Sequence, residues 1–138
     1  MNHRRRKKLA RRLVNAATFG DADSVRALLR SGADPNGPDT EGTMPLYAAS
    51  VAGATVNVLT LLAVGASPDA ESGHGAEGTP LCAASCWGHT DTVRALLAHG
   101  ADPGLREDHG TGRSPLEWAR AGPYPETVAV LLAAGAGA

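Results

Sequence analysis

Apolar residues recur in this chain at the spacing i, i+3 and i+4, which places them along one side of an α-helix. Val93, Leu96 and Leu97 show this spacing, and Gly100 follows where a helix commonly ends in a left-handed residue. The pattern occurs three more times. The matching residues are Val25, Leu28, Leu29 and Gly32, then Val58, Leu61, Leu62 and Gly65, and finally Val128, Leu131, Leu132 and Gly135. Four short amphipathic helices are therefore predicted.

A shorter apolar segment precedes three of these helices and begins with a proline. Pro45, Pro80 and Pro115 fall 35 residues apart, and proline is favoured at the first position of a helix. The segments read M-P-L-Y-A-A-S (44–50), T-P-L-C-A-A-S (79–85) and S-P-L-E-W-A-R (114–120). The first copy, from Leu13 to Ala33, lacks the proline. Each unit is predicted to be a pair of helices.

Two details of the second helices can also be predicted. In the third copy we expect Thr90 or Asp91 to cap the second helix, because both residue types accept hydrogen bonds from free backbone amides. In the last copy we expect Pro125 to open it.

A fixed period in the thirties is typical of repeat proteins, in which each unit buries its apolar side against its neighbours. The expected fold is therefore an all-α solenoid of about four helix-turn-helix repeats joined by turn-like loops. We expect a basic N-terminal extension over residues 1–8 and one repeat domain over 9–138. Its repeats are expected at about 9–41, 42–76, 77–111 and 112–138.

This unit resembles the ankyrin repeat. The resemblance covers about Leu9 to Ala136 and is carried by T-P-L (79–81), A-A (83–84), G-H (88–89), L-L (96–97) and G-A-D (100–102). It implies a module that binds other proteins on a concave surface, without catalysis and without a cofactor. In the family a histidine usually follows Thr-Pro-Leu and ties adjacent turns together. Tyr47, Cys82 and Glu117 stand there instead, so whether this tie forms is open.

The resemblance places the sixth and seventh residues after each proline on the concave surface. Two large rings occupy such places, Phe19 and Trp87, in a chain with only five aromatic residues. Aromatic residues are favoured anchors of protein contacts. An alternative for Trp87 is that it packs on a neighbouring helix. The full set of predicted partner-binding residues is Phe19, Glu41, Val51, Glu71, Cys86, Trp87 and Arg113.

The loop tips are acidic, with Asp39, Glu41, Asp69, Glu71, Glu77, Glu107 and Asp108. As a row, they are expected to steer a partner with a basic surface. For any single acid the simpler interpretation is that it only keeps its loop solvated.

Charge is distributed unevenly along the chain. The net charge is −1, yet residues 4–12, here called the basic arm, hold seven of the thirteen basic residues. The remaining residues 13–138 hold six bases and fourteen acids, a balance of −8. The arm suggests a second kind of function, an adaptor for nucleic acid or an anionic surface. The residues predicted to bind such a polyanion are Arg4, Arg5, Arg6, Lys7 and Lys8. The alternative is a polar capping helix that covers Leu9 and Leu13.

Other kinds of site receive little support. Cys82, Cys86 and His89 share a helix side, but no second ligand pair lies near, so no metal site is expected. No catalytic or nucleotide-binding motif is present, and we expect no enzyme. Two cysteines without a secretory signal favour a cytoplasmic location, or a nuclear one in a eukaryote. No membrane-spanning segment is expected.

The second copy departs from the others on the side of its second helix that faces outward. Asp23 and Arg26 form an acid–base pair in the first copy, and Asp91 and Arg94 form one in the third. Val56 and Leu59 replace them in the second. The expected state is a monomer, with weak self-association or a second contact at this apolar spot as the alternative to an ordinary surface.

Overall fold

The computed structural model describes residues 1–137, and over that range it contains eight α-helices, a short 3-10 turn and no strand. The all-α prediction is therefore confirmed. The helices are α1 His3–Phe19, α2 Ala22–Arg30, α3 Pro45–Ala52, α4 Thr55–Ala63, α5 Pro80–Cys86, α6 Thr90–Ala98, α7 Pro115–Ala121 and α8 Pro125–Ala133, with the 3-10 turn η1 at Gly73–Gly75. In the part of the chain described, no helix combines the length and the apolar character needed to cross a membrane.

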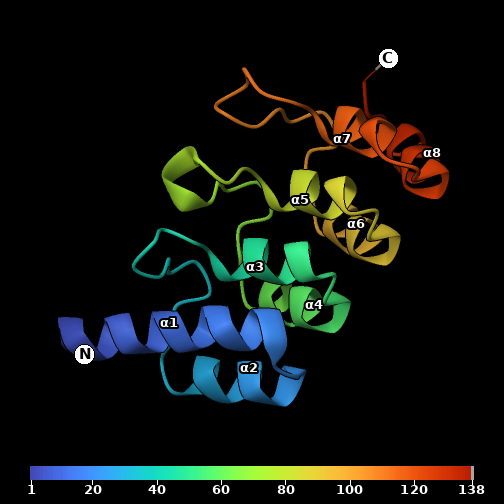
Figure 1. The fold of residues 1–138 in the computed structure, drawn as a ribbon. Helices are drawn as coiled ribbons and strands as arrows, with labels where there is room; N and C mark the ends of the chain where they lie inside the picture. Colours follow the sequence, from blue (N-terminus) through green and yellow to red (C-terminus); the bar gives the residue numbers. More distant parts are fainter. Residues whose placement is uncertain (138) are drawn as a thin grey trace.

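The helices form two layers (Figure 1). The first layer is α1, α3, α5 and α7, each packed on the next, and the second is α2, α4, α6 and α8 in the same order. Each first-layer helix also packs on the second-layer helix that follows it in the chain. The long loops lie on the side of the stack toward which the N-terminal end of α1 extends (Figure 1). This is the predicted stack of helix pairs.

The core lies between the two layers and is built from leucine, valine and alanine. In the second layer Leu61, Leu96 and Leu131 are fully buried. In the first layer Leu46, Leu81 and Leu116 are at most 4% exposed. Each layer supplies one row of buried leucines, and the two rows face each other along the stack. A single repeat supplies only one member of each row, so it could not bury its own apolar side.

The helix starts follow the sequence in most places. Pro45, Pro80, Pro115 and Pro125 are first residues of their helices, and the side chain of Thr79 accepts a hydrogen bond from the amide of Cys82. The prediction for α6 was wrong, because His89 holds the cap position and neither Thr90 nor Asp91 does. The Thr90 hydroxyl instead lies 2.8 Å from the Thr127 hydroxyl in the next repeat.

Buried polar side chains tie each repeat to the one before it. Asn57, Thr92 and Thr127 occupy the same position in successive repeats and are at most 4% exposed. The Asn57 amide donates to the carbonyls of Ala17 at 3.2 Å and Gly20 at 2.9 Å, at the end of α1. The Thr92 hydroxyl lies 2.9 Å from that of Thr55. These bonds satisfy groups that would otherwise be buried without partners.

The tie between adjacent turns forms in part without the histidine. The Tyr47 hydroxyl donates to the Glu77 carbonyl at 3.0 Å, which joins α3 to the loop before α5. The Cys82 sulfur lies 3.6 Å from the Arg113 carbonyl, a weaker contact of the same kind. Glu117 makes no such link and pairs with Arg106 at 2.6 Å. Between Tyr47 and Cys82 the difference follows from length, because the phenol reaches the next loop and the shorter thiol barely does.

The basic arm is part of α1. In the repeat register Pro45 corresponds to Arg12, so residues 3–11 have no counterpart in the other first-layer helices. Leu9 is 6% exposed and Leu13 is fully buried, as the capping interpretation requires. Asn2 caps the helix by accepting from the amide of Arg5 at 2.8 Å. The arm thus covers one end of the stack.

Candidate protein-interaction surface

Two aromatic side chains stand out from the first layer. Phe19, the last residue of α1, is 85% exposed, and Trp87, which directly follows α5, is 58% exposed. They occupy the same position in the first and third repeats, where the other two repeats have Ala52 and Gly122. Leucine, valine and alanine fill the core without either ring, so the two rings take no part in its packing.

Val51 and Cys86 precede that position by one residue and are half-buried. The carbonyl of Val51 is 3.0 Å from His89 Nε2, a contact that joins α3 to the start of α6. Burial raises the pKa of the Cys86 thiol, and the nearby Glu107 carboxylate acts in the same direction. Cys86 is therefore a neutral thiol that adds apolar surface beside Trp87. We call Phe19, Val51, Cys86 and Trp87 the first-layer surface.

Arg113 lies in the loop before α7 and is exposed. Its guanidinium carbon is 4.7 Å from the centre of the Trp118 ring, a cation–π contact. The Trp118 indole N–H donates to Glu107 at 2.8 Å. Burial raises the pKa of Glu107, while the bond from Trp118 opposes that shift. Glu107, Trp118 and Arg113 therefore contact one another in sequence at the loop before α7, with Arg113 exposed to solvent.

The acidic loop residues are used largely to hold the loops together. The Glu71 side chain is 16% exposed and accepts from the amide of His109 at 2.7 Å. The Glu77 carboxylate accepts from the hydroxyls of Ser72 and Thr43. Asp39 accepts from backbone amides of its own loop, which leaves Glu41 as an exposed acid without a side-chain bond there. Partner contact by Glu41 or Glu71 stays a prediction.

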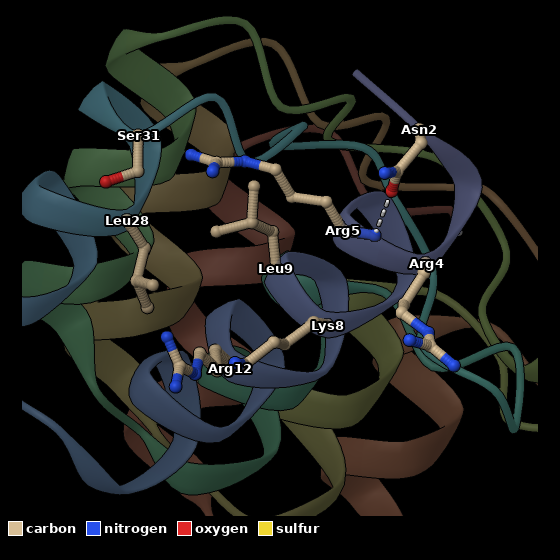
Figure 2. Close-up of a pocket in the computed structure, with 8 residues that line it drawn as sticks. All are labelled: Asn2, Arg4, Arg5, Lys8, Leu9, Arg12, Leu28 and Ser31. Atoms are coloured by element: carbon tan, nitrogen blue, oxygen red, sulfur yellow. Dashed lines mark hydrogen bonds between the residues drawn. The ribbon is translucent and has the colours of Figure 1, made fainter.

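The basic arm lines a hollow between α1 and the end of α2 (Figure 2). The hollow measures about 380 Å³, and its lining includes Arg4, Arg5 and Lys8 of the predicted polyanion site. In Figure 2 the Arg5 side chain extends across the hollow toward Ser31. Arg12, an arm residue outside the predicted set of five, lines the same hollow two turns after Arg5. The helical spacing i, i+4, i+8 from Arg4 would have indicated it.

Arg6 and Lys7 are separated from that hollow. They line a different groove, against the first loop near Asp34 and Gly37. Among residues 1–137, no side chain of the basic arm forms an ion pair. Since α1 contains no acid, the arm presents positive charge without compensation along its own helix.

Cys82 and His89 do not form a metal centre with Cys86. Cys82 is buried, and burial raises the pKa of its thiol to about 12. His89 instead contacts the carbonyl of Val51. Within the described residues, no group of three or more His, Cys, Asp or Glu side chains is placed to hold a metal ion.

The comparison with known protein families matches residues 13–107 and 55–138 to ankyrin repeats (3 copies). Among the curated proteins none matches this chain. The matched ranges together span residues 13–138, nearly the whole chain, and they agree with the paired helices and loops of the structure. The chain therefore belongs to the ankyrin-repeat family.

Proposed function

We propose that this protein binds a partner protein through the first-layer surface, with Phe19 and Trp87 as anchors. The observation that carries the proposal is the exposure of both rings, 85% and 58%, at one repeat position. Exposed aromatic residues supply large apolar area at little conformational cost and dominate many interfaces. Ankyrin repeats generally are protein-interaction modules, which agrees with this assignment.

The two anchors suit a partner with an extended contact surface. One stacked helix, α3, separates α1 from α5. At 8–10 Å between neighbouring helix axes, the rings stand roughly 20 Å apart. Val51 and Cys86 lie between and beside them, and Glu41 and Arg113 are proposed as polar contacts from the loops. A rigid stack offers these groups with little ordering cost on binding.

We infer that the module acts without catalysis. The two cysteines are free and neutral, which fits a reducing cytoplasmic setting. Partner choice would then rest on surface shape and charge alone.

The test is affinity capture from cells that produce the protein, with partner recovery measured by quantitative mass spectrometry. Trp87→Ala should reduce recovery of the specific partner by about ten-fold or more, since a buried aromatic anchor is worth at least 1.4 kcal/mol. Leu132→Ala, which alters an exposed leucine of α8, is the matched control and should leave recovery unchanged. Circular dichroism should show unchanged helix content in both variants. Equal recovery with Trp87→Ala, or loss of helix content, would refute the assignment.

A second candidate function is binding of a polyanion, such as nucleic acid or an anionic surface, by the basic arm. The supporting observation is that no arm base forms an ion pair in the described chain, and that four of these bases, Arg4, Arg5, Lys8 and Arg12, line one hollow. Phosphate groups bind such side chains with a strong dependence on salt.

Charge reversal in the arm tests this second function. Arg5→Glu with Lys8→Glu should weaken binding to a labelled DNA duplex. The plot of log association constant against log salt concentration should become less steep by about 2, because two phosphate contacts are lost. Arg120→Glu, an exposed arginine of α7, is the control. If wild type and the double variant bind the duplex equally, the arm serves only as a cap.

A further inference from the structure

The helix α4 differs from the other second-layer helices in its outward side. In α2 the pair Asp23–Arg26 forms an ion pair at 3.0 Å, and in α6 Asp91 pairs with Arg94 at the same distance. At the matching positions α4 carries Val56 and Leu59, and it contains no charged residue at all. In α8 Glu126 holds the acid position and pairs with Arg94 at 3.1 Å, while Ala129 stands at the base position. Among the second-layer helices of the described chain, α4 is therefore the one without a charged residue.

The outward side of α4 lines an exposed apolar groove. Val56 is 61% exposed, Leu59 39% and Val64 51%. These side chains line a shallow groove of about 640 Å³ between α2 and α4, together with Leu29, Thr60 and Ala63. We call it the outer groove. Single exposed apolar residues are ordinary, but three neighbours along α4 and its C-terminal cap form a continuous patch that is typical of a contact site.

Charge at the outer groove is confined to one edge. Arg26 and Arg30, one turn apart on α2, are its only charged lining residues. Arg26 is paired with Asp23, whereas Arg30 has no ion pair within residues 1–137. The opposite edge, formed by α4, is uncharged. An occupant that matches this groove is apolar toward α4 and acidic toward α2.

We propose that the outer groove binds an amphipathic helix of a partner protein whose acidic edge faces Arg26 and Arg30. Two adjacent helices form a channel into which a third helix packs with its side-chain ridges. Apolar residues at i, i+3 or i+4 and i+7 of that helix would contact Val56, Leu59 and Ala63. At 1.5 Å per residue α4 offers roughly 13 Å, so the bound segment has two to three turns. This site is separate from the first-layer surface.

A second copy of this chain fits the groove less well. If two α4 helices packed antiparallel about a two-fold axis, the α2 helices of both copies would lie opposite each other. Arg26 and Arg30 would then face the same residues of the other copy, and like charges disfavour that arrangement.

The experiment uses the full chain and two designed fluorescent helical peptides of about 16 residues, long enough to form some helix alone. Both carry a leucine stripe; one has glutamates and the other lysines along the flank. Fluorescence anisotropy should give at least about ten-fold tighter binding of the glutamate peptide. Arg30→Glu should remove or invert that preference.

The control for location restores the pattern of the neighbouring repeats. Val56→Asp with Leu59→Arg copies the ion pair of α6 and should fold normally, as unchanged helix content would show. This variant should lose binding of the glutamate peptide by about ten-fold or more. Lys8→Glu, in the basic arm, and Trp87→Ala should bind the peptide as wild type does. If the glutamate peptide does not bind the outer groove, the proposal that Trp87 anchors a partner at the first-layer surface is unaffected.

Three results would overturn the proposal. The first is that the glutamate peptide fails to bind, or binds no better than the lysine peptide. The second is that Val56→Asp with Leu59→Arg leaves its affinity unchanged. The third is a wild-type dimer in light scattering that this double variant converts to a monomer, because the occupant would then be a second copy.

Discussion

At the scale of single residues, buried polar side chains join neighbouring repeats by hydrogen bonds. Asn57 is the clearest case, because its amide donates to backbone carbonyls at the end of α1 from a position that is 4% exposed. A buried amide of this kind stabilises the boundary between the first and second repeats.

Asn57→Ala should therefore destabilise the protein by about 1–3 kcal/mol, because buried carbonyls would lose their donor. Urea unfolding followed by circular dichroism measures the change. The exposed Asn15 of α1 provides the control, and Asn15→Ala should change stability by no more than about 0.5 kcal/mol. Equal effects of both substitutions would show that the Asn57 bonds contribute nothing specific.

Residue identity alone did not reveal how the loop acids are used. The sequence predicts that Glu71 and Glu77 help to steer a partner or keep their loops solvated, yet both also accept hydrogen bonds within or between loops. The partner of Glu71, the amide of His109, lies 38 residues away. Its position depends on the backbone path of two long loops. The exposure of Phe19 and Trp87, by contrast, followed from their place in the repeat.

At the scale of the helices, the starts of α3, α5 and α7 and the ends of the second-layer helices were predictable. Proline and glycine impose local backbone geometry, so Pro80 and Gly100 mark their places without help from the rest of the fold. The start of α6 was not predictable, because Thr90 is drawn into a hydrogen bond with the following repeat. At Pro80 and Gly100 the local sequence was therefore sufficient to place the helix boundary, whereas at Thr90 a hydrogen bond to the next repeat changed the outcome.

The glycine that ends α3 is also a packing requirement. Gly53 has φ 67°, and a Cβ added there would lie 2.6 Å from Nδ1 of His89. Gly53→Ala should cost about 1–2 kcal/mol from the left-handed backbone alone, and more from displacing His89. Thermal unfolding measures it, with Gly104→Ala as the control, since a Cβ at Gly104 meets only Asp102 at 3.7 Å. A stable Gly53→Ala variant would contradict the described packing of His89.

At the scale of the whole molecule, the stack presents three separate surfaces. The first-layer surface carries exposed rings, the basic arm covers the first repeat with positive charge, and the outer groove lies beside the uncharged helix α4. Each surface can be recognised by comparing the repeats. Where one repeat has a residue that the others lack at the same position, the fold common to all four does not require that residue. Phe19 and Trp87 against Ala52 and Gly122 illustrate this best.

Hydrogen–deuterium exchange on the complex with a captured partner would separate these surfaces in one measurement. We predict that partner binding slows amide exchange at residues 18–22 and 86–90, the segments around the two rings, and leaves α8 unchanged. Protection confined to residues 4–12 or to α4, with no change around Phe19 and Trp87, would contradict the proposed binding surface.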